Sequence, residues 1–237
     1  MTATPIKLIT LDLDHTLWDP DAALQRGEKE SHAWLAAQHP AFGEQFPADA
    51  FVGLRMQLRE QYPALKNRVS EIRRIAFQQA LQQTGMDTAD SQRLAEQAFD
   101  VFWQARQQVN IFSDTPALLE QLSQHFVLGA LSNGNACLKT IGLAQHFRFH
   151  FAAENFPAAK PAPDMFLAAL EHSGVAPCEA LHIGDHPVDD MQGAQAVGMK
   201  TLWVNFAETP WPLATAAPDL TVTSLPMILE ALLPPAR

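Results

Sequence analysis

The sequence predicts an α/β protein: a Rossmann-like, doubly wound parallel sheet into which an α-helical bundle is inserted. Three observations lead to this fold class. Short apolar runs alternate with helical segments after residue 110, a similar apolar run opens the chain, and long helical segments of different composition separate the two. We therefore expect a core domain of residues 1–17 and 110–237, and a helical cap domain of residues 18–109.

The apolar run Ile6–Leu13 is rich in leucine and β-branched residues and is typical of a buried strand that ends in a polar loop. Further strands are expected at 126–131, 149–152, 180–183, 201–204 and 220–222. The helices expected between and after them span 116–125, 136–142, 163–173, 190–197 and 225–233. The proline-rich stretch 210–218 is expected to be a surface loop.

The inserted block is rich in Ala, Gln, Leu, Arg and Glu, which are good helix formers. Breaks at Pro40, Pro63 and Gly85 divide it into candidate helices. These span 21–38, 48–61, 67–84 and 88–108. Apolar residues recur at helical spacing around residues 75–81, which indicates a bundle.

Composition excludes several classes of protein. With 237 residues, 47% hydrophobic and 18% charged, the chain is globular. Its net charge of −10 argues against nucleic acid as a partner, because binding the phosphate backbone needs basic residues. Cys137 and Cys178 are too few for a disulfide scaffold or a cysteine-rich zinc module. Without a signal-peptide pattern or an apolar run of about 18 residues, we expect a cytoplasmic protein with no membrane partner.

The acidic residues are unevenly distributed. Residues 17–110 hold 10 basic and 12 acidic side chains, whereas the rest of the chain holds 6 basic and 14 acidic ones. Surface solvation explains such an excess of acidic residues as well as a divalent-metal site does. The positions of the acidic residues in the chain must therefore decide between the two explanations.

Polar side chains stand where the predicted strands end. They are Asp12 and Asp14 after the first strand, Ser132 and Asn133 after the strand at 126–131, and Asp185, Asp189 and Asp190 after the strand at 180–183. Lys160 precedes a predicted helix. Because the carboxyl ends of parallel strands meet at one edge of a sheet, we expect these groups to converge there.

This set of groups suits phosphoryl chemistry. Several carboxylates in one crevice repel one another, and hard oxygen ligands without a thiolate or histidine favour Mg²⁺. A metal, a lysine, a hydroxyl and backbone amides together neutralise and position a phosphoryl group. A carboxylate can act as the nucleophile by forming an aspartyl-phosphate.

Each group also has a structural explanation. The stretch Ser132–Gly134 is typical of a turn or helix cap, Lys160 alone is an ordinary surface lysine, and one of Asp189 and Asp190 is expected to cap a helix. His182 and His186 lie on a strand and a turn rather than on one helix face, so a zinc site is not expected. The order and strand-end placement of the groups favour the functional interpretation.

Four motifs resemble those of the haloacid dehalogenase superfamily of phosphohydrolases. They are DLDHTL at Asp12–Leu17, LSNGN at Leu131–Asn135, AKPAPDMF at Ala159–Phe166 and HIGDHPVDDMQGA at His182–Ala194. They occur in the family's order and leave the helical insertion as its cap domain. The resemblance implies a Mg²⁺-dependent phosphatase that acts on a small-molecule phosphate ester.

The resemblance also implies residue roles. Asp12 is the nucleophile and a Mg²⁺ ligand, and Asp14 is the general acid and base, with its backbone carbonyl on the metal. Lys160 holds the nucleophile and offsets charge. Thr16 supports the loop, Ser132 and the Asn133 amide bind phosphoryl oxygens, and Asp185 and Asp190 are metal ligands. The motif spacing leaves Asp189 and Asp190 as alternatives; Gly193-Ala194 as anchor selects Asp190, with Asp189 as a cap or supporting group.

Asp14 favours phosphatase over dehalogenase activity, because an alkoxide leaving group needs a general acid and a halide does not. The layout resembles that of riboflavin-pathway phosphatases acting on 5-amino-6-(5-phospho-D-ribitylamino)uracil. Phosphoglycolate and nucleotide phosphatases, and a non-catalytic phosphate-binding regulator on this fold, are the alternatives. Substrate choice is expected to lie in the cap, which offers the cations Arg55, Lys66, Arg68, Arg73 and Arg74. The oligomeric state, monomer or homodimer, is left open.

Overall fold

The computed structural model describes residues 5–233, which form two compact units, each with its own core. Within the described residues, one unit comprises 5–19 and 111–233, and the other comprises 20–110. The short strands β2 (Trp18–Asp19) and β3 (Asn110–Ile111) pair where the chain passes between the units. Residues 1–4 and 234–237, the ends of the expected core domain, lie outside the described residues.

The first unit is built on a six-stranded, all-parallel sheet with the order β5-β4-β1-β6-β7-β8. The strands are β1 (Leu8–Leu11), β4 (Val127–Ser132), β5 (Phe149–Ala152), β6 (Ala180–Gly184), β7 (Lys200–Val204) and β8 (Leu220–Val222). Because the chain proceeds outward from β1 in both directions, a crevice is expected at the carboxyl ends of β1, β4 and β6. This arrangement confirms the predicted fold class.

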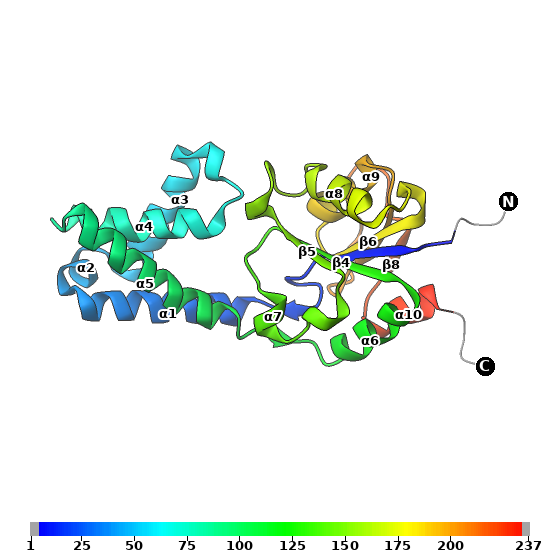
Figure 1. Ribbon diagram of the computed structural model, residues 1–237, viewed down its shortest axis with the longest axis horizontal. Helices are drawn as coiled ribbons and strands as arrows, with labels where there is room; N and C mark the ends of the chain where they lie inside the picture. Colours follow the sequence, from blue (N-terminus) through cyan, green and yellow to red (C-terminus); the bar gives the residue numbers. More distant parts are fainter. Residues whose placement is uncertain (1–4, 234–237) are drawn as a thin grey trace. The chain divides into compact units, whose positions relative to one another are not determined.

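Helices cover both faces of this sheet. Helices α8 (Asp164–Ser173) and α9 (Gly193–Ala196) lie on one face, and α6 (Thr115–His125) and α10 (Pro226–Leu232) lie on the other (Figure 1). This unit also contains α7 (Leu138–Ile141) and the 3-10 turns η2 (Ala144–His146), η3 (Ala153–Asn155) and η4 (Pro177–Glu179). Among the described residues, no helix combines the length and apolar character needed to cross a bilayer.

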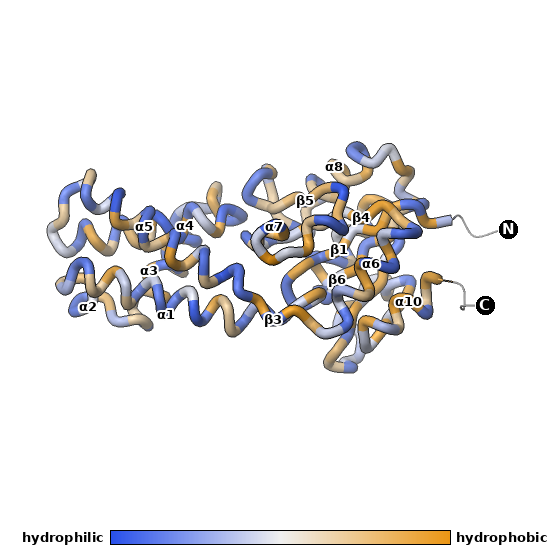
Figure 2. Tube along the Cα trace, turned by 60° about the horizontal axis from the view of Figure 1, so that its bottom comes forward, coloured by the Kyte–Doolittle hydropathy of each residue, from blue (hydrophilic) through white to orange (hydrophobic). Residues whose placement is uncertain are grey.

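The strands next to the crevice are apolar because both faces of the sheet are covered. All four residues of β1 and all five of β6 are buried. On the α8 side, Met165 and Phe166 pack in one cluster with Leu8 and Leu131 of the sheet. Orange apolar residues are accordingly prominent in the sheet of this unit (Figure 2). This close packing holds the strand ends, and the side chains that follow them, in fixed positions.

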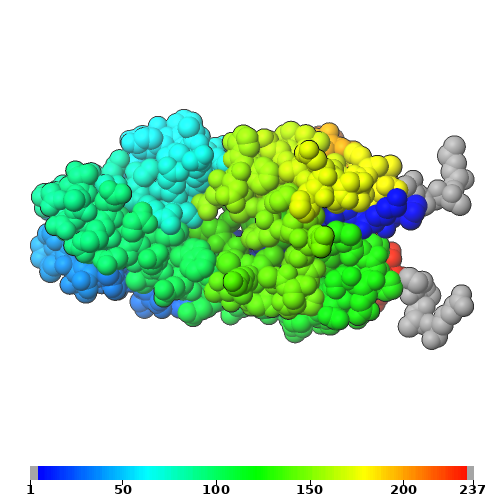
Figure 3. All heavy atoms as spheres, viewed as in Figure 1, coloured from blue at the N-terminus to red at the C-terminus, as the bar shows by residue number. Residues whose placement is uncertain are grey.

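The second unit is helical. Its elements are α1 (Asp21–Gln38), α2 (Pro40–Gln45), α3 (Ala48–Gln61), η1 (Pro63–Leu65), α4 (Val69–Gln83) and α5 (Thr88–Arg106). Its core combines leucine and alanine side chains with three aromatic rings: Phe51 and Phe77 stack at 4.7 Å, and Phe42 lies beside Phe51. Figure 3 shows these helices, blue through cyan to green, as a closely packed body on the face in view. Helix α2 was not predicted from the sequence; Pro40 begins it rather than only ending α1.

The segment after β6 differs from the prediction. A single α-helix was expected at 190–197, but the chain forms a π-helical turn, η5 (Pro187–Gln192), followed by the short α9. The wider turn carries both Asp189 and Asp190, and it leaves Asp190 buried while Asp189 is partly exposed. Periodicity in the sequence cannot reveal a π-turn, because its spacing differs from the 3.6-residue period of the flanking helix.

Candidate active site

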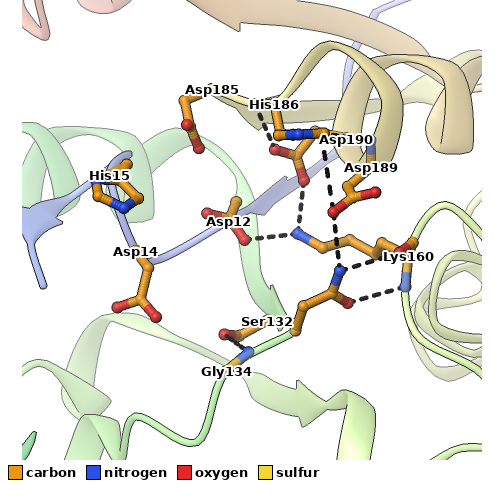
Figure 4. Close-up of a pocket in the computed structure, with 11 residues that line it drawn as sticks. Asp12, Asp14, His15, Ser132, Gly134, Lys160, Asp185, His186, Asp189 and Asp190 are labelled. Atoms are coloured by element: carbon orange, nitrogen blue, oxygen red, sulfur yellow. Dashed lines mark hydrogen bonds and ion pairs between the residues drawn. The ribbon is translucent and has the colours of Figure 1, made fainter. Parts of the chain in front are cut away.

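The predicted strand-end residues line one pocket of the first unit, with a volume of about 190 Å³ (Figure 4). Its walls come from the loops after β1, β4 and β6 and from the segment around residue 160. The lining residues are Asp12, Asp14, His15, Ser132, Asn133, Gly134, Lys160, Asp185, His186, Asp189 and Asp190.

Lys160 stands at the centre of the site. Its Nζ donates to Asp12 Oδ1 at 2.6 Å, to Asp190 Oδ1 at 2.6 Å and to the carbonyl oxygen of Leu131 at 2.8 Å. The side chain is 1% exposed. Burial lowers the pKa of this ammonium, but Asp12 and Asp190 outweigh that effect and raise the pKa above its ordinary value. Lys160 is therefore a fixed positive charge at neutral pH.

Asp190 accepts hydrogen bonds on both carboxylate oxygens. Oδ1 accepts from Lys160 and from His182 Nε2 at 3.1 Å, and Oδ2 accepts from the backbone N–H of His186 at 2.9 Å. Burial raises the pKa of this carboxyl, but Lys160 and His182 outweigh burial and leave the pKa below its usual range. Asp190 thus stays ionised and fixes the direction of the Lys160 ammonium.

A buried pair of polar residues supports Asp190 from the sheet. His182 on β6 is completely buried, and its Nδ1 lies 2.8 Å from Thr10 Oγ1 on β1. Burial lowers the pKa of His182, which keeps the ring neutral near pH 7. With Nε2 protonated toward Asp190, Nδ1 accepts the hydroxyl hydrogen of Thr10. These contacts make a continuous chain from Thr10 through His182 and Asp190 to Lys160 and Asp12.

The negative charge of Asp12 and Asp185 is only partly compensated, because Lys160 contacts Asp12 but also Asp190. Burial, then the charges of Asp190 and Asp185, raises the pKa of Asp12 well above its ordinary value, although Lys160 opposes this. Burial and Asp190 likewise raise the pKa of Asp185. Thr16 Oγ1 lies between them, 3.4 Å from Asp12 Oδ2 and 3.2 Å from Asp185 Oδ1. Each raised pKa indicates a carboxylate that an additional cation would stabilise.

The acidic groups fit a divalent metal. Carboxylate oxygens of Asp12, Asp185 and Asp190 lie within 4.8 Å of one another, and Lys160 brings a positive charge into contact with Asp12 and Asp190. Hard oxygen donors in this number suit Mg²⁺, which binds through one or two carboxylates and keeps waters. Asp12 and Asp185 have carboxylate oxygens that can serve as ligands of the metal ion, whereas the carboxylate of Asp190 already accepts three hydrogen bonds from the protein.

Asp14 lines the same pocket but is held separately. Trp18 Nε1, on a completely buried side chain, donates to Asp14 Oδ1 at 2.7 Å. The backbone between them turns tightly, with His15 N–H bonded to the Trp18 carbonyl at 2.8 Å and His15 at a φ of 63°. In Figure 4 the Asp14 carboxylate lies apart from the Asp12–Lys160–Asp190 group. One of its oxygens is thus oriented by an indole N–H, and the carboxylate is not engaged by Lys160.

The end of β4 and the loop after it supply polar groups that both accept and donate hydrogen bonds. Ser132 is buried, and its Oγ accepts from the Gly134 N–H at 3.0 Å. The Asn133 side chain accepts from the Lys160 N–H at 2.9 Å and donates to the Lys160 carbonyl at 3.0 Å and to Asp189 Oδ2 at 3.2 Å. Asn133 therefore fastens the loop to the Lys160 segment, and Asp189 completes that contact.

Several residues of the site were not assigned a role from the sequence. Trp18, Thr10 and His182 orient acidic groups, and His15 and His186 line the pocket. A histidine inside an apolar strand, as His182 is, signals a buried hydrogen bond, because a buried ring nitrogen needs a partner. The partner itself, eight residues away on a π-turn, carries no sequence signal.

Comparisons with known proteins place the chain in a family. The family model described as haloacid dehalogenase-like hydrolase matches residues 6–198. The chain belongs to this hydrolase family, as its resemblance predicted.

Relatives within the family carry different names. The chain is 31% identical over 199 residues to 5-amino-6-(5-phospho-D-ribitylamino)uracil phosphatase YigB of Escherichia coli (strain K12), covering 84% of this chain and 83% of that protein. It is 24% identical over 242 residues to N-acylneuraminate-9-phosphatase of Rattus norvegicus, covering 98% and 97%. A crystal structure called 2-haloacid dehalogenase, from Pseudomonas syringae pv. Tomato DC3000, superposes with a TM-score of 0.90 at 39% identity, covering 96% of this chain and 98% of that one.

Proposed function

We propose that this chain is a Mg²⁺-dependent phosphatase that hydrolyses small-molecule phosphomonoesters through an aspartyl-phosphate on Asp12. The observation that carries the proposal is the pairing of two differently held carboxylates in one pocket. Asp12 is bound to Lys160, and Asp14 is bound to Trp18. The first is suited to attack phosphorus, and the second is suited to exchange a proton.

In the first step, a carboxylate oxygen of Asp12 forms a bond to phosphorus while the ester P–O bond breaks. The departing alkoxide takes a proton from the Asp14 carboxyl, which becomes a carboxylate. Lys160 holds Asp12 in one orientation, so the nucleophile needs no reorganisation before attack.

In the second step, the Asp14 carboxylate takes a proton from a water molecule, and the resulting hydroxide attacks phosphorus. The bond to Asp12 breaks, phosphate leaves, and both carboxyl groups return to their starting states. Ser132 Oγ and the Asn133 N–H, both at the pocket wall, would donate to the phosphoryl oxygens in each step.

Asp12, Asp185 and the Asp14 carbonyl oxygen would hold the metal, with Asp190 as a fourth oxygen donor or as the anchor of Lys160. Mg²⁺ bound there would neutralise charge on the phosphoryl group. The raised pKa values of Asp12 and Asp185 support this site, since they indicate excess negative charge.

Asp14 separates this proposal from dehalogenase activity, the activity named for the Pseudomonas syringae structure. Expelling a halide requires no proton, so a carboxylate oriented by an indole N–H has no task in that reaction. Relatives named as phosphatases support the same choice. The first candidate substrate is 5-amino-6-(5-phospho-D-ribitylamino)uracil, by likeness to the Escherichia coli relative. Phosphoglycolate and nucleotides are the alternatives.

The test is turnover of an aryl phosphate, an alkyl phosphate and a chlorinated carboxylic acid by the full chain with MgCl₂. We expect phosphate release from both esters and no chloride release. Asp12→Asn should lower kcat by about 10⁴-fold or more, as removal of a nucleophile does. Equal rates in the two proteins, or chloride release alone, would contradict the proposal. Phosphate binding without turnover would identify a non-catalytic regulator instead.

A further inference from the structure

The peptide group that follows Asp185 is held at both of its polar ends. Its carbonyl oxygen, which belongs to Asp185, accepts a hydrogen bond from Trp203 Nε1 at 2.7 Å. Its N–H, which belongs to His186, donates to Asp190 Oδ2 at 2.9 Å. Because a peptide group is planar, hydrogen bonds at its two opposite ends fix the orientation of the whole plane. The backbone directly after a candidate metal ligand is therefore restrained.

Trp203 reaches this carbonyl because of its position in the sheet. In the register of β6 and β7, Trp203 lies opposite Gly184, the last residue of β6. The pairing of the two strands ends with these residues, and the Asp185 carbonyl lies one residue beyond them. The indole N–H thus supplies a hydrogen bond where the ladder no longer provides one. A side chain of β7 sets the direction of the chain at the point where β6 enters the pocket.

The indole of Trp203 is itself fixed in place. The residue is 5% exposed, and Trp211 packs against it edge to face, with ring centroids 5.2 Å apart. Trp211 Nε1 donates to the Thr215 carbonyl at 3.2 Å, and Thr215 Oγ1 accepts from Gln192 Nε2 at 2.9 Å. Gln192 is the last residue of η5. The loop between β7 and β8 is therefore fastened to the same turn that carries Asp190.

A fixed peptide plane leaves the Asp185 carboxylate with its side-chain torsions as the main freedom. Thr16 Oγ1 donates to Asp185 Oδ1 at 3.2 Å, and carboxylate oxygens of Asp185, Asp12 and Asp190 lie within 4.8 Å of one another. In Figure 4 the Asp185 carboxylate extends toward Asp12. Residues that orient a metal ligand raise metal affinity, because a ligand already in place loses less conformational freedom when the ion binds.

A buried indole N–H needs a partner in any fold, and this is the purely structural explanation of the Trp203 contact. Trp211 provides the comparison. Its indole N–H bonds a carbonyl of its own loop, four residues along the chain. The Trp203 donor instead crosses from β7 to the residue that follows β6 in the pocket. The two indole donors are chemically equivalent and differ in what they hold, so one serves as the control for the other.

We propose that Trp203 is a positioning residue for the metal site: its indole holds the peptide group after Asp185 and so aims the Asp185 carboxylate at the position that Mg²⁺ would occupy beside Asp12. The loop between β7 and β8 keeps the indole there through the ring of Trp211. The inference rests on the proposed phosphatase function, since that function supplies the Mg²⁺ site.

The test measures Mg²⁺ binding to the full chain by isothermal titration calorimetry, without substrate. Trp203→Phe removes the indole donor and keeps an aromatic ring in the buried position. We expect the Kd for Mg²⁺ to rise by about tenfold or more, as it does when a residue that orients a metal ligand is replaced. Trp211→Phe, the same substitution in the neighbouring ring, should leave the Kd unchanged. With an aryl phosphate, the Mg²⁺ concentration that gives half the maximal rate should rise in Trp203→Phe by the same factor, whereas kcat should fall less.

A second readout uses the wild-type protein and does not depend on the folding of a variant. In ¹⁵N-labelled protein, the Nε1–H resonance of Trp203 should shift when MgCl₂ is added, because its acceptor carbonyl belongs to a metal ligand. The resonance of Trp34, on α1 of the second unit, is the reference and should not shift.

The outcomes separate this inference from the proposed function. Weaker Mg²⁺ binding in Trp203→Phe, with no hydrolysis of any ester by the wild type, would support the positioning role and contradict the phosphatase. An unchanged Kd in folded Trp203→Phe, an equal rise in Trp211→Phe, or no Mg²⁺ binding by the wild type would overturn the positioning role. If Trp203→Phe does not fold, the wild-type titration decides: a shift of the Trp203 resonance supports the role, and its absence overturns it.

Discussion

Lys160 connects polar groups that come from three different segments of the chain. Its ammonium contacts Asp12 after β1, the Leu131 carbonyl on β4 and Asp190 on the turn after β6. In a site so thoroughly buried, one cation between two carboxylates replaces the water that each of them has lost. The acidic residues can then share a small pocket and remain available for chemistry.

Trp18 orients the group proposed as general acid, and its effect should depend on the leaving group. Trp18→Phe removes the indole donor to Asp14 but keeps a ring in a completely buried position. We expect kcat for alkyl phosphates to fall roughly tenfold, the value of one hydrogen bond to a charged group. Aryl phosphates should be nearly unaffected, because their leaving groups need little protonation. Steady-state rates with matched alkyl and aryl esters test this, and an equal loss for both would show that Trp18 acts only on the fold.

Sequence reasoning predicted which residues line the pocket better than it predicted their contacts. Asp12, Asp14, Ser132 and Asp185 could be placed together because parallel strand ends meet at one edge. The support of Asp190 by His182 could not be foreseen, because it depends on the side-chain directions of a strand and a π-turn. The hydrogen bond from Trp18 to Asp14 could likewise not be predicted, because it depends on a tight turn of the backbone at His15 and not on the spacing of the two residues in the sequence.

At the scale of elements, the end of β6 and the π-turn η5 are in close contact. A Cβ on Gly184, the last residue of β6, would overlap the Asp190 carboxylate. Glycine is thus required here by close approach of a side chain and not by a positive φ. The π-turn brings the carboxylate over the strand end, where it meets Lys160 and His182.

Gly184→Ala should therefore displace Asp190 and weaken both activity and stability. We expect a loss of about 1–3 kcal/mol in the free energy of unfolding, as for other insertions into packed sites, with a large fall in kcat. Gly53→Ala is the control: Gly53 lies within α3 with open space around its Cβ position, so alanine should stabilise by up to about 1 kcal/mol. Urea unfolding of both variants measures this. A neutral Gly184→Ala would show that η5 is free to move.

Helix boundaries were predicted well where apolar periodicity is strong. The helices observed at Asp21–Gln38 and Ala48–Gln61 match the expected bounds, because breaks in the pattern coincide with proline. Short elements were missed, including α2 and the strands β2 and β3, because two to six residues carry too little pattern. The single α-helix expected at 190–197 was wrong. A short π-helical turn forms there and carries Asp190, and a segment this short has too little pattern to be predicted from the sequence.

For the whole molecule, part of the net charge of −10 comes from Asp12 and Asp185 in the pocket, and we expect their ionisation to depend on pH and on bound Mg²⁺. The pKa values of Asp12 and Asp185 are raised in the metal-free protein. A carboxyl whose folded pKa exceeds its unfolded value costs stability as pH rises through the folded pKa. Metal-free protein should therefore lose stability from these two groups as pH rises above about 4, the ordinary carboxyl pKa.

Added Mg²⁺ should reverse that loss, because it binds only the ionised carboxylates. We expect the Tm difference between MgCl₂ and NaCl at matched ionic strength to be small near pH 4 and to grow toward pH 7. At a concentration of 100 times Kd, the stabilisation is about 2.7 kcal/mol. Asp185→Asn should abolish most of it. A Mg²⁺ effect that is independent of pH, or intact in Asp185→Asn, would place the metal elsewhere.

The chain divides into two compact units of different construction. The first has the pocket with the proposed reacting groups at the edge of its sheet, and the second is a helical bundle with a core of its own. The composition boundaries that the sequence shows near residues 17 and 110 lie close to the division at residues 19 and 111. We propose that the first unit is the hydrolase core and the second is its cap.

The central claim is that Asp12 carries the phosphoryl group. Asp14→Ala should form the aspartyl-phosphate from an aryl phosphate, whose leaving group needs no acid, but should hydrolyse it slowly for want of a base. Acid-quenched protein, digested and analysed by mass spectrometry, should show one added phosphoryl group on the peptide containing position 12. The modification should be absent when Asp12→Asn is added to Asp14→Ala. Continued turnover in that double variant, or a phosphoryl group on any other residue, would contradict the mechanism.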